Sequence, residues 1–338
     1  MSNKFNSIFI TGGAGYCGSL IVPTLLQKGL KVKVYDTLFF SDKFLPKHKN
    51  LEVVKADIRD IEKFKQEVSG FEVVLHLACI SNDASFELDE KLSTSINLDA
   101  FEPLVEVSKS AGVKRFIYAS SSSVYGVSEE RDVTEEHPLV PLTLYNKYKG
   151  LCEPILNSYK SDDFVVTTFR PATVCGYAPR LRLDLSVNIL TNHAINKDKI
   201  TVFGGSQLRP NLHVKDYVRA CELFIGADSK SINGEVFNVG QENMSILDLA
   251  HVVRKVVMDE FPDKREVTIE RTESNDNRSY HINSEKIKRD LNFSPIFGVE
   301  DAIRDLCEAF KNGKVSNSFD DDIFFNIRTM KKIQSDHA

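Results

Sequence analysis

The sequence predicts an α/β protein, in which a doubly wound parallel sheet carries a smaller α/β lobe. Apolar strand patterns alternate with helical patterns through the first half of the 338 residues, as in parallel sheets that are covered by helices on both faces. The alternation loosens after Gly176, where a helix-rich segment begins. The length also exceeds that of a typical single domain, so two coupled lobes are expected.

The first strand, 8–10, breaks into closely spaced glycines. Residues 11–18 read Thr-Gly-Gly-Ala-Gly-Tyr-Cys-Gly, which contains both the G-x-G-x-x-G and the G-x-x-G-x-x-G spacing, and apolar residues then recur at helical intervals. A strand, a glycine turn and a helix in this order predict a Rossmann-type dinucleotide site, because turn and helix present backbone N–H groups to a diphosphate. The cofactor contacts predicted here are Gly12, Gly15, Tyr16, Cys17 and Gly18.

The second strand, 31–35, ends at Asp36. An acid at this place in a dinucleotide fold accepts hydrogen bonds from the adenosine ribose hydroxyls, and its charge repels the 2′-phosphate of NADP. An acid after a strand is often only a turn residue, but the glycine turn favours the functional interpretation. The sequence therefore predicts NAD as the cofactor, with Asp36 on its adenosine ribose.

Polar or small residues follow the next two strands, at the edge where such a sheet binds ligands. Asp57, followed by Ile58, could accept a hydrogen bond from the adenine amino group or cap the next helix. Leu77 and Ala78 end the fourth strand and would let a flat cofactor lie against the backbone. The elements expected in this part of the chain are strands at 51–55, 72–77 and 115–119 and helices near 61–68 and 93–111.

A serine run, 120–123, follows the fifth strand, and Tyr145-x-x-x-Lys149 comes after a polar loop. On a helix, positions i and i+4 share one face. A phenol with a pKa near 10 is a poor base at neutral pH, but an adjacent ammonium group and an oxidised nicotinamide favour its anion, and a serine hydroxyl can share the proton. The same spacing is common on solvated helix faces, so the dinucleotide turn is what favours the catalytic interpretation.

The composition narrows the class of protein. Hydrophobic residues make up 42% and charged residues 27% of the chain, with a formal net charge of −5, which favours a soluble globular protein and neither a nucleic-acid nor a membrane partner. We expect no signal peptide and no membrane span, since no apolar run is long enough. The six cysteines are far apart and lack metal-ligand spacing, so we expect no metal site, and buried free thiols in the reducing cytoplasm.

Taken together, these motifs resemble those of the extended short-chain dehydrogenases/reductases. The nucleotide-sugar epimerase and dehydratase branch, with its UDP-glucose 4-epimerase-like members, is more similar still. The resemblance covers nearly the whole chain, and it implies NAD as the cofactor and a nucleotide-diphosphate sugar as the substrate. The motifs that carry it are Gly12-x-x-Gly15-x-x-Gly18, Asp36, the serines before Val124-Tyr125-Gly126, Tyr145-x-x-x-Lys149, and the segments 170–176, 209–216 and 237–240.

The resemblance also implies roles for individual residues. Tyr145 would be the general base and acid, Lys149 would hold the nicotinamide ribose and lower the pKa of Tyr145, and Ser121 would lie beside the sugar. Asn97 matches an asparagine that supports the active site of the family, with structural capping as the alternative. The substrate contacts implied are Ser121, Ser122, Thr173, Asn188, Arg209 and Arg278, of which the two arginines would grip the diphosphate with their planar guanidinium groups.

The sequence departs from the dehydratases of this branch at Ser122 and Ser123. Those enzymes carry an Asp-Glu pair there, because water elimination needs an acid for the leaving hydroxyl and a base for the adjacent C–H, and related decarboxylases carry a glutamate in place of Ser123. A serine hydroxyl cannot replace a carboxylate as a base at neutral pH. NAD-dependent epimerisation at carbon 4, through a transient 4-keto sugar, is therefore favoured. The alternatives are a 4-dehydrogenase or ketoreductase, a less favoured 4,6-dehydratase, and a catalytically silent NAD-binding protein.

The two lobes are expected to be discontinuous in sequence. Arg180 and Arg182, at the start of the second lobe, fit surface charges and a role at the substrate equally well. The last stretch, 316–338, is either a docked helix or a frayed tail. The expected NAD-binding domain comprises 1–175 and about 211–240, and the expected nucleotide-sugar-binding lobe comprises about 176–210 and 241–338.

The resemblance further implies a homodimer. Its two chains would meet through the helix that contains Asn97 and the helix that follows Tyr145, whose outer faces can form a two-fold contact. Pro103 and Pro154 interrupt these two helical patterns in the sequence.

Overall fold

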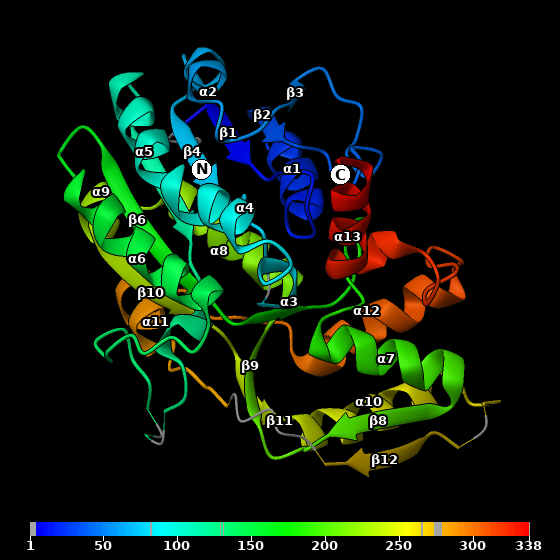
Figure 1. The fold of residues 1–338 in the computed structure, drawn as a ribbon. Helices are drawn as coiled ribbons and strands as arrows, with labels where there is room; N and C mark the ends of the chain where they lie inside the picture. Colours follow the sequence, from blue (N-terminus) through cyan, green and yellow to red (C-terminus); the bar gives the residue numbers. More distant parts are fainter. Residues whose placement is uncertain are drawn as a thin grey trace.

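A computed structural model describes residues 5–337 of the chain, apart from 82, 129, 131, 265 and 274–278. A seven-stranded parallel sheet with its helices forms one part of the molecule, and two smaller sheets with their helices lie at one end of it (Figure 1). The prediction of an α/β fold with a doubly wound parallel sheet is confirmed.

The large sheet has the strand order β10-β6-β5-β4-β1-β2-β3, and all its neighbouring strands are parallel. The direction of winding reverses between β1 and β4, which are neighbours in the sheet although two strands separate them in sequence. Ligands of such sheets bind outside the carboxyl ends of the strands at this switch point. The strands are β1 (Ser7–Thr11), β2 (Lys31–Asp36), β3 (Leu51–Lys55), β4 (Val73–His76), β5 (Arg115–Ala119), β6 (Val165–Pro171) and β10 (Glu235–Val239).

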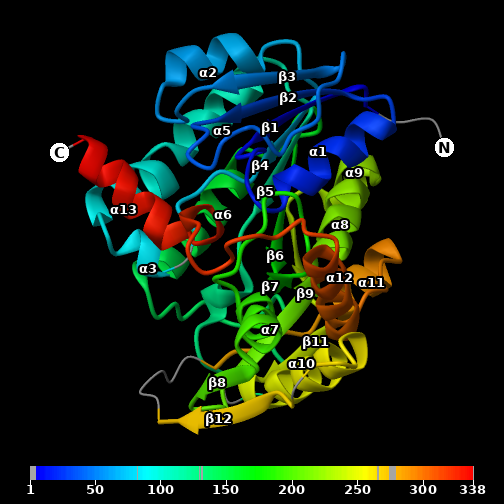
Figure 2. The same ribbon diagram turned by 90° about the vertical axis from the view of Figure 1, so that its right-hand side faces the viewer.

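Helices cover both faces of this sheet, because its central strands are apolar on both sides. All five residues of β1 are buried, for example. Helices α1, α8, α9 and α11 lie on one face of the sheet, and α2, α5 and α6 lie on the other (Figure 2). Their side chains belong to two separate apolar clusters. The helices are α1 (Gly18–Gln27), α8 (Val214–Gly226), α9 (Ser229–Ile232), α11 (Glu285–Leu291), α2 (Ile61–Val68), α5 (Phe101–Ser110) and α6 (Leu144–Ser158).

The helical run that contains Asn97 is not the single α-helix expected over 93–111. It begins with α4 (Glu90–Thr94), passes through a π-helical turn, Ser95–Asp99, and continues as α5. Such π turns are rare and occur often at functional sites. The prolines do not end their helices: Pro103 lies in the first turn of α5, shortly after the π turn, and α6 continues through Pro154.

The smaller lobe is built on two small sheets. In the first, β9 runs parallel to β7 and antiparallel to β11; in the second, β8 and β12 are parallel. Side chains of α7, α10 and α12 form one apolar cluster with β8. The bounds are β7 (Thr173–Cys175), β8 (Lys199–Phe203), β9 (Leu208–His213), β11 (Glu242–Ser245), β12 (Thr268–Thr272), α7 (Ser186–Lys197), α10 (Ile246–Glu260) and α12 (Val299–Lys311).

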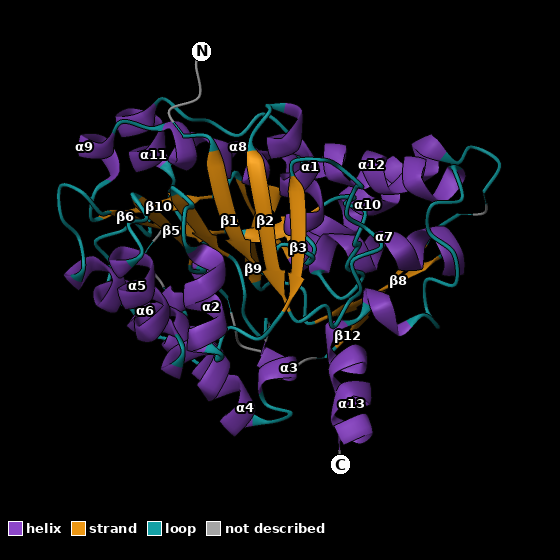
Figure 3. Cartoon of the chain, turned by 90° about the horizontal axis from the view of Figure 1, so that it is seen from above, coloured by secondary structure: helices purple, strands orange, loops and turns teal. Residues whose placement is uncertain are grey.

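The C-terminal segment is a docked helix. After a short 3-10 helix, Asp322–Phe324, α13 (Asn326–His337) lies beside α3 (Asp83–Phe86) (Figures 1 and 3). Met330 of α13 is buried in the same apolar cluster as α2, α5 and α6. None of the helices that the structure describes has the length and apolar character needed to cross a membrane.

Candidate active site

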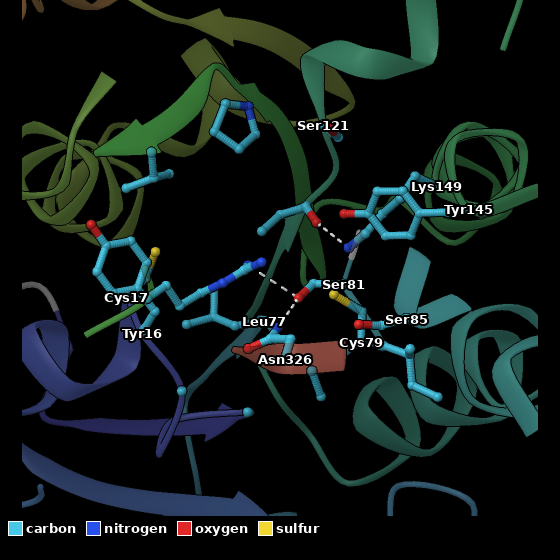
Figure 4. Close-up of a pocket in the computed structure, with 18 of the residues that line it drawn as sticks. Tyr16, Cys17, Leu77, Cys79, Ser81, Ser85, Ser121, Tyr145, Lys149 and Asn326 are labelled. Atoms are coloured by element: carbon cyan, nitrogen blue, oxygen red, sulfur yellow. Dashed lines mark hydrogen bonds between the residues drawn. The ribbon is translucent and has the colours of Figure 1, made fainter. Parts of the chain in front are cut away.

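A cavity of about 440 Å³ opens at the carboxyl ends of β1, β2, β4 and β5, at the switch point of the large sheet. Tyr16 and Cys17 lie on one side of it, Tyr145 and Lys149 lie on the other, and Asn326 lies near the middle (Figure 4). The predicted site residues that line this cavity are Gly12, Gly15, Tyr16, Cys17, Gly18, Asp36, Asp57, Ile58, Leu77, Ala78, Ser121, Ser122, Tyr145, Lys149, Thr173 and Arg209.

The glycine turn has the close backbone packing that a diphosphate site requires. Gly12 has a φ of +73°, and a Cβ there would lie 2.7 Å from the backbone of Ala78. A Cβ on Gly18 would overlap the carbonyl group of Gly13. Only glycine fits both positions. Since α1 begins at Gly18, the turn lies directly at a helix N-terminus, and the residues present fit the diphosphate of a dinucleotide.

Asp36 lies at the end of β2 and faces the cavity. Its Oδ2 accepts a hydrogen bond from the N–H of Ala14 at 3.0 Å, and its Oδ1 accepts one from the N–H of Leu38 at 2.8 Å. Burial raises the pKa of Asp36 above its ordinary value, while these two hydrogen bonds and the charge of Arg180 oppose the rise. Each carboxylate oxygen has a second lone pair, so Asp36 can also accept hydrogen bonds from ribose hydroxyls.

Replacing Asp36 by Asn should weaken NAD binding and reduce the discrimination against NADP. A hydrogen bond to a charged group contributes about 1.5–3 kcal/mol, so we expect the dissociation constant of NAD to rise about ten- to hundredfold. Calorimetric titration with both cofactors measures the effect, and Asp162→Asn, which removes the same charge at an exposed position, is the matched control. Unchanged affinities for both cofactors in Asp36→Asn would contradict the assignment.

Asp57 does not cap α2, which was one of its two expected roles. The cap is Asp60, whose side chain accepts a hydrogen bond from the N–H of Lys63. Asp57 instead pairs with Arg59, with Nη2 2.7 Å from Oδ2 and Nε 3.0 Å from Oδ1. Burial raises the pKa of Asp57, but the hydrogen bonds from Arg59 outweigh it and hold the pKa below its ordinary value. With Ile58, Asp57 lines the cavity near Asp36, so its contact with adenine stays a prediction.

Helix α6 presents Tyr145 and Lys149 to the cavity from one face (Figure 4). The Nζ of Lys149 donates a hydrogen bond to the carbonyl oxygen of Ala119 at 2.8 Å, which ties the helix to the end of β5. Ser121 caps a short 3-10 helix, Ser122–Tyr125, and its Oγ lies 2.7 Å from the Oγ of Ser123. A phenol, an ammonium group and a serine hydroxyl therefore line one cavity, as general acid–base chemistry at a hydroxyl-bearing carbon requires.

The environment of Tyr145 favours the neutral phenol. Burial raises the pKa of Tyr145 well above its ordinary value, Cys79 and Asp83 add to the rise, and Arg182 opposes it. Burial therefore outweighs the positive charge of Arg182, and a lower pKa requires a further positive charge at the site. An oxidised nicotinamide carries one.

A buried ion pair lies behind the serine run. Glu153, one turn after Lys149 on α6, accepts a 2.6 Å hydrogen bond from Arg170 Nη2 and a 2.6 Å hydrogen bond from Ser120 Oγ. Arg170 in turn donates to the hydroxyl of Tyr125 at 2.6 Å. The two charged side chains are 5% and 6% exposed. This network joins α6, the end of β5 and β6, and so fixes the positions of Tyr145 and Ser121 relative to each other.

Two asparagines predicted at the site bond to the protein backbone instead. The side chain of Asn97 pairs with both the N–H and the carbonyl of Ile80, each at 2.9 Å, and so holds the chain after β4 in place. Asn188, expected to contact substrate, is fully buried; it accepts from the N–H of Gly176 at 2.9 Å and donates to the carbonyl of Arg182 at 2.8 Å. Neither lines the cavity, so the prediction of a substrate contact by Asn188 is corrected to a framework role.

Thr173 and Arg209 border the side of the cavity that faces the smaller lobe. Arg209 Nη1 donates to the carbonyl of Leu208 at 2.8 Å, and its guanidinium lies 5.1 Å from the centre of the Tyr280 ring. The other predicted diphosphate ligand, Arg278, lies outside the described residues.

Several cavity residues were not predicted from the sequence. Arg180 and Arg182, which fitted surface charges and a role at the substrate equally well in the sequence, are only 1% and 9% exposed and line the cavity, together with Asn326. All six cysteines are free, but Cys79 and Cys17, the latter a predicted cofactor contact, are partly exposed and line the cavity rather than being buried. The alternation Arg-Leu-Arg-Leu over 180–183 was a signal that the arginines share one side of an extended segment.

The fold and the site define an NAD-binding enzyme of the short-chain dehydrogenase/reductase type. Its cofactor site combines a glycine turn with an acid at the end of β2, and a Tyr–Lys pair faces that site. Residues 8–240 match the model of the NAD dependent epimerase/dehydratase family. The chain belongs to this family.

Relatives and solved structures agree with this membership. A protein from Oryza sativa subsp. japonica named UDP-glucose 4-epimerase 1 is 26% identical, over 90% of this chain and 95% of its own length. The UDP-glucose 4-epimerase from Thermotoga maritima, solved with UDP-glucose, has a TM-score of 0.80 at 26% identity and covers 91% of this chain and 99% of its own. The dTDP-glucose 4,6-dehydratase DesIV from Streptomyces venezuelae has the same fold, with a TM-score of 0.79 at 21% identity over 90% of this chain and 97% of its own.

The resemblance to the extended short-chain dehydrogenases/reductases is therefore confirmed, and NAD is the cofactor. The glycine turn and Asp36 fit it, as described above. NAD, when bound, supplies the chemistry of reversible oxidation at a carbon that bears a hydroxyl group. The family includes both epimerases and dehydratases, so the reaction has to be inferred from the residues around Tyr145.

Proposed function

We propose that this protein epimerises a nucleotide-diphosphate sugar at carbon 4, through a transient 4-keto sugar. The observation that carries the proposal is the serine pair at 122 and 123, directly after Ser121 and in the same cavity as Tyr145. Epimerisation needs one acid–base group for the 4-hydroxyl, and it does not need the additional acid and base that remove water in a dehydratase. The residues present match that requirement.

Tyr145 would remove the proton of the 4-hydroxyl as the carbon is oxidised, and would return it when the ketone is reduced on its other face. Ser121, whose Oγ lies within 2.7 Å of Ser123 Oγ, would share this proton with the phenol. Lys149 keeps one of its N–H groups on Ala119 and would offer its remaining ones to the nicotinamide ribose. Arg209 and Arg278 would hold the diphosphate of the sugar nucleotide while the sugar turns.

Elimination has less support, because the two residues that follow Ser121 in the sequence are serines and not acids. Ser122 is 2% exposed, and the Oγ of Ser123 donates to the side chain of Asn146. Among the described residues that line the cavity, the carboxylates are Asp36, Asp57 and Asp83. The first two lie toward the expected adenosine end, and Asp83 accepts a 2.6 Å hydrogen bond from Thr143. A 4-dehydrogenase or ketoreductase uses the same residues as an epimerase and is the second candidate.

Incubation with a panel of nucleotide sugars in heavy water tests the reaction. The hydrogen removed from carbon 4 returns to the same carbon in an epimerisation, so the product should carry no carbon-bound deuterium. Its mass should equal that of the substrate, and NADH should not accumulate. Mass spectrometry and NMR of the product, with absorbance at 340 nm, measure all three, at turnover rates of roughly 1 per second or more.

Two other results would contradict the proposal. A dehydratase product is lighter by one water and takes up deuterium at carbon 6. A dehydrogenase or reductase changes the redox state of the cofactor with each turnover or needs a second ketone substrate.

Three further expectations stay predictions. They are homodimerisation through the helical run that contains Asn97 and through α6, the division into two lobes at the stated residues, and a cytoplasmic location.

A further inference from the structure

Two arginines enter the cofactor cavity from the segment after β7. This segment alternates between charged residues and leucines, and Leu181 and Leu183 are buried in a cluster with the Asp322–Phe324 helix and α12. Successive side chains of an extended chain point to opposite sides. Arg180 and Arg182 therefore point away from that cluster, and both line the cavity.

Arg180 is held beside the glycine turn by three contacts. Its backbone N–H donates to the Oγ of Ser19, in the first turn of α1, at 3.1 Å. Its guanidinium lies 3.7 Å from the centre of the Phe40 ring, and its Nη2 donates to the Oδ1 of Asn326 at 2.6 Å. The first contact ties the backbone of Arg180 to the start of α1, and the other two place its guanidinium between Phe40 and the C-terminal helix.

The hydrogen bonding of Arg180 is incomplete. The whole residue is only 1% exposed, and its buried Nε has no partner among the residues that the structure describes. Buried N–H donors are almost always satisfied in folded proteins. Arg182 has a similar buried donor, Nη2, without a described partner, but its Nε already pairs with Asp184 at 2.8 Å. Arg180 therefore places a buried positive charge in the wall of the cavity, and its Nε donates to none of the described residues.

The position of Arg180 indicates which ligand it serves. Asp36 marks the adenosine end of the cavity, and Tyr145 with Lys149 marks the nicotinamide end. The diphosphate of NAD joins these two ends and would lie at the glycine turn, next to Ser19, which holds the backbone of Arg180. A guanidinium group suits phosphate because it forms parallel charge-assisted hydrogen bonds. Burial and the nearby Arg182 lower the pKa of Arg180 to about 9, so a bound anion would be stabilised by the unpaired charge.

We propose that Arg180 is a cationic ligand of the NAD diphosphate, complementing the backbone N–H groups of the glycine turn, and that Asn326 of α13 positions its guanidinium. The proposal depends on NAD as the cofactor and is independent of the reaction at the sugar. It assigns part of the cofactor site to the C-terminal helix, outside the residues 8–240 that match the family model.

Asn326 is well placed for this positioning role. Its backbone N–H donates to Asp184 Oδ2 at 3.0 Å, and its Nδ2 donates to Ser81 Oγ at 2.8 Å (Figure 4). Ser81 also accepts a hydrogen bond from Arg182 Nη1 at 3.3 Å. One asparagine thus connects the chain after β4, the arginine segment and α13, so docking of the C-terminal helix and the geometry of Arg180 are coupled.

Calorimetric titration of the NAD-free protein tests the proposal, with NAD, ADP-ribose, adenosine and UDP as separate probes. Arg180→Gln should weaken NAD and ADP-ribose binding about ten- to hundredfold, and should change adenosine and UDP binding by less than about twofold, because adenosine has no phosphate and UDP belongs to the sugar site. Arg180→Lys keeps the charge without the planar group, so its affinity for NAD should fall less than that of Arg180→Gln. Asn326→Ala should lose still less NAD affinity, and it should release NAD faster than the wild-type protein in stopped-flow measurements. Arg304→Gln, an exposed arginine on α12, is the control for net charge.

Three results would overturn the proposal. In the first, the NAD affinity of Arg180→Gln stays within about twofold of the wild-type value. In the second, its affinity for adenosine falls as much as its affinity for NAD. In the third, only its affinity for UDP falls. If thermal melting shows that Arg180→Gln does not fold, Arg180→Lys and Asn326→Ala decide the question by the same probes. Since no sugar nucleotide is turned over in this experiment, a protein that binds NAD through Arg180 but makes no epimer would contradict the proposed reaction alone.

Discussion

Replacing Tyr145 by Phe should lower kcat by about two to four orders of magnitude, the usual contribution of a positioned general acid–base group. The substitution removes one hydroxyl from a half-buried ring that lies on α6 and packs near Phe86 at 6.4 Å between ring centres. Ser121 and Lys149 remain, but a serine hydroxyl is too weak a base at neutral pH to replace the phenol. NAD binding should change little, because the glycine turn and Asp36 are untouched.

The chain offers a closely matched control. Tyr148 lies on the same helix, three residues away, and packs on the same ring of Phe86 at 5.6 Å. Tyr148 does not line the cavity, so Tyr148→Phe should keep kcat within about twofold of the wild-type value. Initial rates with the nucleotide sugar that the panel identifies give both numbers. Turnover by Tyr145→Phe within about tenfold of the wild-type rate would remove Tyr145 from the proposed role, and absence of turnover in the wild-type protein would favour the catalytically silent alternative.

The parts of the site that could be predicted from the sequence are local in the chain. A glycine turn between a strand and a helix, an acid at the end of the next strand and a Tyr–Lys pair one helical turn apart are each contained in a few residues. Strand ends of a parallel sheet meet at one edge, so local patterns are enough to place Gly12, Asp36 and Tyr145 in one cavity. The structure does so.

The parts that were not predicted depend on contacts between distant segments. Arg180 bonds to Asn326, 146 residues further along the chain, and no local pattern indicates that partner. Asn188 shows the converse: the family resemblance implied a substrate contact, but its side-chain oxygen accepts a hydrogen bond from the backbone N–H of Gly176. The π turn around Asn97 is a third case, because it forms where the asparagine side chain pairs with Ile80 on a different element.

The buried pair Glu153–Arg170 should be the most sensitive point for stability near the site. Glu153→Leu would leave Arg170 charged and 5% exposed without its carboxylate, and would remove the acceptor of Ser120. Removing one partner of such a pair costs about 3–5 kcal/mol of the free energy of unfolding. Urea denaturation of the NAD-free protein, followed by circular dichroism, measures the loss.

The double variant Glu153→Leu/Arg170→Met separates the buried charge from lost packing. With neither charge present, no unpaired ion remains in the interior, so the double variant should be more stable than Glu153→Leu alone. Glu260→Gln, which breaks a more exposed contact with Arg304 and Lys311, should lose only about 0–1 kcal/mol. A Glu153→Leu protein as stable as Glu260→Gln would show that the pair is not a main support of the fold.

Glu153 also joins α6 to the serine run. We therefore expect kcat to fall in Glu153→Leu even under conditions in which the protein is fully folded, because Tyr145 and Ser121 lose the contact that holds both in place.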